Sequence, residues 1–178
     1  MLDKKFFTIK TSINKKDYNR FLYIATFLRR KLTIPIIIII TALMSLFVAY
    51  SNKSFSLKNF FIYWFFLIVI TLFAIIIKIE FKTKEKAKNE NDSTLKSVET
   101  LELFDDYMSI KSTAFKGKSK IKYKKIYEIL ESKKYIIIYF NKRQASIIRK
   151  KDLEKGSLED LRSFLIEKLG NKYKKLFK

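Results

Sequence analysis

The side chains that could carry acid–base chemistry are acidic residues in the C-terminal half of the chain. Asp105 and Asp106 are adjacent in a predicted turn, and Glu159 and Asp160 are adjacent at a predicted helix start. Acidic residues are favoured at both places for local structural reasons. The other acidic candidates are Glu128, Glu131, Asp152 and Glu154. The chain has no histidine and no cysteine, so it lacks the commonest general base and every thiolate.

Two further kinds of catalytic signal are also missing from the sequence. The three glycines, Gly117, Gly156 and Gly170, stand far apart and form no phosphate-binding loop. No serine lies in a nucleophile-elbow pattern, and a Ser-His-Asp triad requires a histidine. We therefore expect no enzymatic activity, no metal and no other cofactor.

Basic residues are the more promising candidates for binding. The chain holds 38 lysines and arginines against 17 acidic residues, a formal net charge of +21. One group flanks a predicted strand, and it comprises Lys142, Arg143, Arg149, Lys150 and Lys151. A second group precedes an apolar run, and it comprises Arg29, Arg30 and Lys31. Such clusters can bind anionic lipid head groups through their charge and through hydrogen bonds. The alternative, left open, is that lysine is simply this protein's usual surface residue.

Nucleic-acid binding is a different interpretation of a basic face. Tyrosines such as Tyr123, Tyr127 and Tyr135 are interleaved with the basic residues, as in many nucleic-acid-binding surfaces. Membrane tethering already explains an excess of positive charge on one side of the membrane. We therefore expect no nucleic-acid partner.

Two apolar runs, residues 32–50 and 60–77, determine how the rest of the chain is organised. Neither run contains a charged side chain. At about 1.5 Å per residue, a helix of roughly 18 residues covers most of a hydrocarbon core about 30 Å thick. Two buried helices of a soluble protein are the alternative, but the remaining chain is too short to bury runs that are apolar on every side. The sequence predicts a transmembrane hairpin over residues 32–77.

The charges beside these runs predict the topology. Arg29, Arg30 and Lys31 precede the first run, and the lysines of residues 78–88 follow the second. Because basic residues near span ends stay on the cytoplasmic side, we expect both termini in the cytoplasm and Ser51–Asn59 as an outer turn. The first run begins too late and is too long for a cleaved signal peptide. We expect a multi-pass protein of the cell membrane.

The parts outside the hairpin are predicted to be polar and folded. Residues 1–31 contain a strand, Phe6–Ile13, and an amphipathic helix from Lys15 to Arg30. Asn14 and Asp17 form an approximate capping box at the start of that helix. The helix either lies on the inner leaflet or packs against the soluble domain. Residues 78–97 are a basic linker that is expected to begin as an extension of the second helix and to lose helical structure near residues 89–93, and residues 98–178 form a cytoplasmic domain.

Short strands and one helix make up that C-terminal domain. The predicted strands are 98–104, 107–113, 120–123, 125–131, 135–140 and 144–149. A helix follows, with Ser157 and Asp160 as its capping box and Gly170 as its C-terminal stop. The tail, residues 171–178, either dips into a membrane surface or frays. The predicted fold class is an α+β membrane protein, with a two-helix transmembrane hairpin and a small antiparallel, pleckstrin-homology-like (PH-like) β-barrel or sheet closed by a C-terminal α-helix.

Three stretches resemble the bacterial YcxB-like membrane proteins. Residues 7–21 resemble the family's strand followed by a helix that starts near an Asp-Tyr pair, here Asp17-Tyr18. Residues 121–140 resemble its strand, glutamate-centred turn and hydrophobic strand, and residues 145–165 its return strand, basic loop and final helix. The resemblance implies a PH-like domain, no catalytic residues, and pairing of Phe6–Ile13 with the distant C-terminal sheet.

Two functions remain open at this point. The first is a non-enzymatic integral membrane protein that presents a PH-like interaction domain at the cytoplasmic face and binds a protein partner, anionic lipid or both. The second is an accessory subunit of a transport or signalling complex, with the hairpin as its interface.

Overall fold

The computed structural model describes residues 4–51, 56–88, 95, 97–113 and 117–176, and the chain divides into two compact units. The helical unit comprises residues 19–88. The two-sheet unit combines residues 1–18 with residues 89–178, so the hairpin interrupts it in the sequence.

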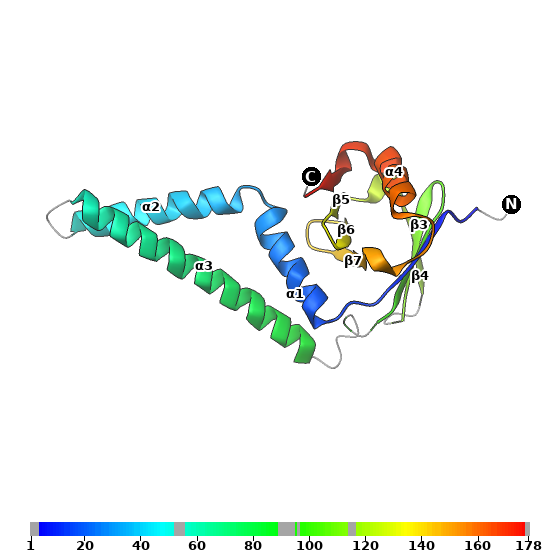
Figure 1. Ribbon diagram of the computed structural model, residues 1–178, viewed down its shortest axis with the longest axis horizontal. Coiled ribbons are helices and arrows are strands. Elements are labelled where there is room, and N and C mark those ends of the chain that lie inside the picture. The colour runs from blue at the N-terminus through cyan, green and yellow to red at the C-terminus, as the bar shows by residue number, and fades with distance from the viewer. Residues whose placement is uncertain (1–3, 52–55, 89–94, 96, 114–116, 177–178) are drawn as a thin grey trace. The chain divides into compact units, whose positions relative to one another are not determined.

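Two long apolar helices, α2 (Thr33–Ser51) and α3 (Leu57–Lys88), form the helical unit together with a shorter helical segment (Figure 1). Both are long and apolar enough to cross a membrane, since an 18-residue stretch of each has a mean hydropathy of 2.3 in α2 and 2.9 in α3. Residues 52–55 of the predicted outer turn lie outside the described residues, and the ends of that turn, Ser51 and residues 57–59, belong to α2 and α3. The two apolar helices predicted from the sequence are confirmed.

Small residues line the contact between α2 and α3. Thr41, Ser45 and Ala49 are spaced by four, so they share one face of α2, and all three are buried. The Ser45 hydroxyl donates to the Phe60 carbonyl at 2.7 Å, and Trp64 Nε1 donates to Thr41 Oγ1 at 3.2 Å. Small side chains let two helix backbones approach closely, which is the common way that apolar helices pack in lipid.

The segment before α2 is helical but not one regular α-helix. Helix α1 (Lys15–Tyr23) has the predicted capping box, in which the Asp17 amide donates to Asn14 Oδ1 at 2.9 Å and the Asn14 amide donates to Asp17 Oδ2 at 3.1 Å. A π-helical turn, η1 (Ile24–Leu28), then replaces the expected α-helix. Within the helical unit, Asn19 donates to Glu80 of α3 at 2.8 Å, so this segment packs against the polar extension of α3.

In the described part of the two-sheet unit, nine strands form two sheets. The five-stranded sheet has the order β4-β3-β2-β1-β8 and the four-stranded sheet the order β7-β6-β5-β9. The strands of the first are β1 (Phe7–Thr11), β2 (Glu99–Leu103), β3 (Tyr107–Ser112), β4 (Lys118–Lys122) and β8 (Leu153–Lys155). Those of the second are β5 (Glu128–Glu131), β6 (Tyr135–Tyr139), β7 (Ala145–Arg149) and β9 (Tyr173–Lys175).

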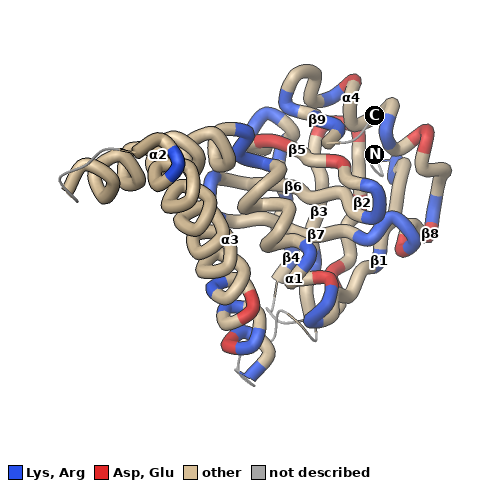
Figure 2. The backbone as a smooth tube through the Cα atoms, turned by 60° about the vertical axis from the view of Figure 1, so that its left-hand side comes forward, with Lys and Arg blue, Asp and Glu red and all other residues tan. Residues whose placement is uncertain are grey.

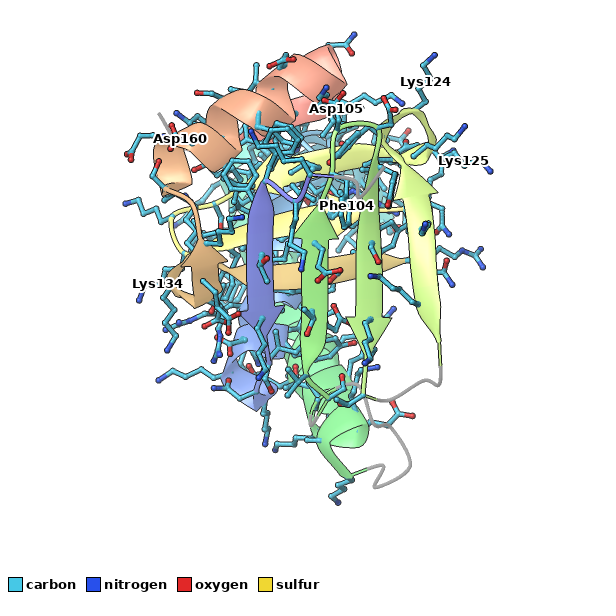
Figure 3. All side chains as sticks on the ribbon, turned by 90° about the vertical axis from the view of Figure 1, so that its right-hand side faces the viewer. Phe104, Asp105, Lys124, Lys125, Lys134 and Asp160 are labelled. Atoms are coloured by element: carbon cyan, nitrogen blue, oxygen red, sulfur yellow. The ribbon has the colours of Figure 1, made fainter. Side chains whose placement is uncertain are left out.

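All neighbouring strands are antiparallel except β5 and β9, which are parallel. Strand β1 pairs with β2 from Phe7↔Leu103 to Thr11↔Glu99, across the whole hairpin, which confirms the pairing implied by the resemblance. The described strands leave both sheets open, so a closed barrel is not formed. The strands of one sheet run across those of the other (Figure 3).

The core lies between the sheets and under helix α4 (Leu158–Leu169). Ile9, Leu101, Ile129, Ile136 and Ile138 come from the facing sides of the two sheets and are at most 2% exposed. Helix α4 adds Leu161, Leu165 and Leu169, all of them buried. Its N-cap is confirmed, since Ser157 Oγ accepts from the Asp160 amide at 3.0 Å, and Gly170 ends it at φ +53°.

Two local predictions fail in this unit. The expected strand over residues 125–131 begins only at Glu128, because a short 3₁₀ helix, η3 (Tyr123–Lys125), comes first and buries Tyr123. The Tyr123 hydroxyl donates to the Phe104 carbonyl at 2.8 Å, a contact that no periodicity reveals. The second is the frayed tail. In its described part, η5 (Gly170–Lys172) is followed by β9, which pairs with β5.

Candidate functional site

The predicted lipid-contact residues fall into two groups, one in each unit. Arg29, Arg30 and Lys31 lie between η1 and α2 in the helical unit, where Arg30 and Lys31 are exposed and Arg29 is half-buried. The other five lie around strand β7 of the two-sheet unit. Figure 2 shows the basic residues of both units in blue, and on α3 the charges gather in its C-terminal part.

Arg149 forms ion pairs with acidic residues inside the two-sheet unit. It lies at the end of β7, and its Nε donates to Asp152 Oδ2 at 2.6 Å, while its Nη1 lies 3.7 Å from Asp17 Oδ2. The hydrogen bond to Asp152 raises the pKa of Arg149, so the guanidinium remains charged. The Thr11 hydroxyl also donates to Asp152, at 2.7 Å, and the Tyr135 hydroxyl donates to Asp17 at 2.7 Å. Arg149 therefore joins β1, the start of α1 and the four-stranded sheet.

Lys150 is engaged in a second network, centred on Glu131. Lys150 Nζ lies 2.5 Å from Glu131 Oε1, Arg162 Nη2 lies 2.8 Å from the same oxygen, and the Tyr173 hydroxyl donates to Oε2 at 2.6 Å. The Glu131 side chain is only 3% exposed. Burial by itself raises the pKa of Glu131, but the hydrogen bonds from Arg162, Lys150 and Tyr173 outweigh it and hold the pKa at about 2.

The Glu131 network joins elements that are distant in the sequence. Glu131 belongs to β5, Lys150 follows β7, Arg162 lies on α4 and Tyr173 begins β9. Burial and the bond to Glu131 raise the pKa of Tyr173, so its hydroxyl stays protonated and donates. Glu131 was one of the acidic candidates in the sequence, whereas its contacts in the structure are those of a carboxylate that holds four elements together.

Lys142, Arg143 and Lys151 are the exposed members of the predicted cluster. Lys142 and Arg143 lie in the turn between β6 and β7, where the Arg143 amide donates to Asn141 Oδ1 at 2.8 Å. The structure thus divides the cluster in two. Three side chains are exposed to solvent, and two are committed to internal ion pairs.

Two of the remaining acidic candidates, Asp105 and Glu128, form ion pairs with lysines. Asp105 accepts from Lys168 at 2.6 Å and Glu128 from Lys174 at 2.9 Å, at different places in the two-sheet unit. Among the described residues, no three His, Cys, Asp or Glu side chains lie close enough together to hold a metal ion.

The structure has a second basic surface, which the sequence did not predict. We call it the lysine face. It is the outer side of the five-stranded sheet, and its exposed members are Lys10, Lys111, Lys118, Lys120, Lys122 and Lys155. The alternation of Lys118, Lys120 and Lys122 in β4 was a visible signal, because every second residue of a strand points to the same side. The contributions of β1, β3 and β8 appear only once the strands are paired.

Comparison with protein families gives one finding that bears on this unit. Residues 105–165 match the model of the YcxB-like protein family. This confirms the resemblance over a stretch that runs from the turn before β3 into α4. The YcxB-like stretch includes Glu131, Arg149, Lys150 and Arg162, whereas Tyr173 lies beyond it. Comparisons with curated proteins and with solved structures found no match.

Proposed function

We propose that this chain is a non-enzymatic integral protein of the cell membrane, in which α2 and α3 span the bilayer and hold a PH-like interaction domain at the cytoplasmic face. There the domain binds a protein partner, anionic lipid or both. Both termini lie in the cytoplasm in this proposal, because the basic residues flank the hairpin at its two outer ends.

The exposed apolar surface of the two long helices is the observation that carries the proposal. Phe47 is 76% exposed, Phe65 63% and Phe73 62%, and they belong to long runs of similarly exposed isoleucine and leucine. A soluble protein rarely leaves so large a continuous apolar surface in water, since burial is worth about 25 cal/mol per Å². Lipid removes that surface from water without any further protein contact.

The architecture of the two-sheet unit supports the PH-like part of the proposal. Two largely antiparallel sheets cross each other around one core, and a helix near the C-terminus supplies three leucines to that core. The hydrogen-bonded networks around Glu131 and Arg149 fix the loops at one end of the four-stranded sheet. The resulting scaffold has exposed basic surfaces, and the chain contains neither histidine nor cysteine.

Cysteine labelling in intact cells tests the membrane topology directly, because the chain has no cysteine of its own. Two single-cysteine variants are compared: Ser51→Cys at the end of α2 and Ser163→Cys on the exposed side of α4. A membrane-impermeant maleimide should label the first in intact cells and the second only after the membrane is opened. Labelling of both in intact cells, or release of the protein by alkaline carbonate, refutes the proposal.

Affinity capture from cross-linked native membranes tests the interaction role. A recurrent, near-stoichiometric protein partner that survives exchange of the hairpin for an unrelated one supports a scaffold with binding in the two-sheet unit. Loss of that partner on hairpin exchange would instead make the chain an accessory subunit, with α2 and α3 as the interface.

A further inference from the structure

The lysine face concentrates positive charge on one side of the two-sheet unit, and this side is turned toward the viewer in Figure 3. Its members come from strands β1, β3, β4 and β8. Among the paired outer-face positions of the described strands, Glu102 is the only acidic residue. Lys118 binds Glu102 at 2.8 Å, and Lys5 also contacts it, so this single negative charge is already shared between two lysines.

Three charges of the face are not used within the fold. Lys10, Lys111 and Lys122 are exposed and make no ion pair with any residue that the structure describes. Lys111 also stands directly opposite Lys118 in the β3–β4 register, and like charges at such positions destabilise a sheet. The exposed lysines therefore do not stabilise the sheet itself. Binding of an anionic ligand on the outer side of the sheet would explain why they are there.

The chemistry of the face favours a fluid, flat anionic surface. Its cations are all lysines, which act as compact, well-hydrated point charges, whereas arginine forks are preferred for fixed, two-pronged phosphate recognition. Five strands spaced by about 4.8 Å make a face roughly 20 Å wide. That is too wide to enter a DNA major groove of about 12 Å, which admits one helix or a two-stranded ribbon.

We infer that the lysine face docks on the anionic lipid head groups of the leaflet beside which the hairpin anchors the domain. The inference rests on the proposed function, because the chain itself then keeps the two-sheet unit close to a bilayer. It assigns docking to a face other than the cluster predicted around β7, of which Lys142, Arg143 and Lys151 are exposed. Arg149 and Lys150 are committed to Asp152 and Glu131, so they have less charge to offer to a lipid than the three unused lysines.

A fluorescent probe at Thr100 reports docking. Thr100 lies between Lys10 and Lys111 in the sheet register, and Thr100→Cys creates the only cysteine of the chain. The full-length protein is placed in nanodiscs of phosphatidylcholine alone or with phosphatidylglycerol, together with a lipid whose head group quenches the probe. We expect quenching only in the phosphatidylglycerol discs, and we expect it to fall with rising salt, since the Debye length is about 8 Å at 0.15 M ionic strength. A probe at Ser163→Cys serves as the control position.

Matched charge removals identify the docking face. Each lysine held near an anionic leaflet changes the docked-to-undocked ratio by roughly fivefold. The triple change Lys10→Gln, Lys111→Gln and Lys122→Gln should therefore lower that ratio by about two orders of magnitude. A second triple change removes the same number of charges from the cluster predicted by sequence. It comprises Lys142→Gln, Arg143→Gln and Lys151→Gln, and it should leave the ratio within about fivefold.

The possible results separate the two proposals. Protein that fails to stay in the discs overturns the proposed function and, with it, this inference. Protein that is inserted but unquenched in phosphatidylglycerol, or equally affected by both triple changes, overturns the inference alone. Binding of a short DNA duplex that the first triple change abolishes, without lipid quenching, also overturns it and assigns the face to nucleic acid.

Discussion

Replacing Glu131 by glutamine should strongly destabilise the two-sheet unit at neutral pH. Glutamine keeps the shape of the side chain but removes the charge that Lys150, Arg162 and Tyr173 surround. A carboxyl whose pKa is held at about 2 instead of 4.5 stabilises the folded state by about 3 kcal/mol. Removing one partner of a buried ion pair costs a similar amount, about 3–5 kcal/mol, because the remaining charges lose their compensation.

The same reasoning predicts a dependence on pH. Since the folded-state pKa of Glu131 is lowered, its stabilisation is fully present above pH 4.5 and is lost as the pH falls toward about 2. At pH 3 about 1 kcal/mol of it should remain. The free-energy difference between wild type and Glu131→Gln should therefore shrink from about 3 kcal/mol at pH 7 to about 1 kcal/mol at pH 3.

Hydrogen–deuterium exchange with mass spectrometry measures this in the full-length, detergent-solubilised protein. Peptides from β5 and β6 should lose about 100-fold or more of their protection in Glu131→Gln at pH 7, since each 1.4 kcal/mol is a factor of ten. Glu167→Gln is the matched control: that side chain is 74% exposed, and its loss should change the free energy of unfolding by no more than about 0.5 kcal/mol. Equal effects of the two changes, or a Glu131→Gln effect that is the same at pH 7 and pH 3, would refute the reasoning.

Two further changes test local features of the two-sheet unit with the same exchange assay. Ser157→Ala removes the N-cap of α4 and should cost about 1 kcal/mol, seen first as faster exchange in the first turn of that helix; unchanged exchange there contradicts the cap. Gly156→Ala should cost about 1–3 kcal/mol, because φ is +95° and the new Cβ would lie 2.5 Å from the buried Phe7 ring. Gly117→Ala shares the positive φ but meets no atom within 4 Å, so it should cost clearly less, and equal costs would show that the contact with the ring is unimportant.

Much of the local structure was predictable, because it depends on neighbours in the sequence. The apolar runs predicted two long helices, and Asn14 with Asp17 and Ser157 with Asp160 predicted two helix starts that the structure confirms. Strand β6 was predicted as a continuous apolar strand and lies inside its sheet, where both faces are buried. Predictions of local structure were wrong where a tertiary contact outweighed local preference. At η3, a 3₁₀ helix that buries Tyr123 stands where the start of a strand was expected.

The candidate surfaces were less predictable than the elements that carry them. Arg149 and Lys150 are close in sequence to exposed basic residues, but both are bound to carboxylates inside the unit. Arg149 binds Asp152 and lies near Asp17, and Lys150 binds Glu131. The Asp17 contact of Arg149 comes from a residue more than a hundred positions earlier. A charge pattern shows how many basic residues lie in a segment, but it does not show which of them already have a partner.

The sequence by itself determined the apolar helices, most strands, the helix caps and the excess of positive charge, since each depends on periodicity, composition or short-range hydrogen bonds. Only the tertiary structure decided that the two sheets stay open, that β1 lies between β2 and β8 in its sheet, and that β9 pairs with β5. It also decided which lysines share a face. Those outcomes depend on strand pairing between segments that are far apart in the chain, and the free energy of that pairing comes from a shared core that no single segment encodes.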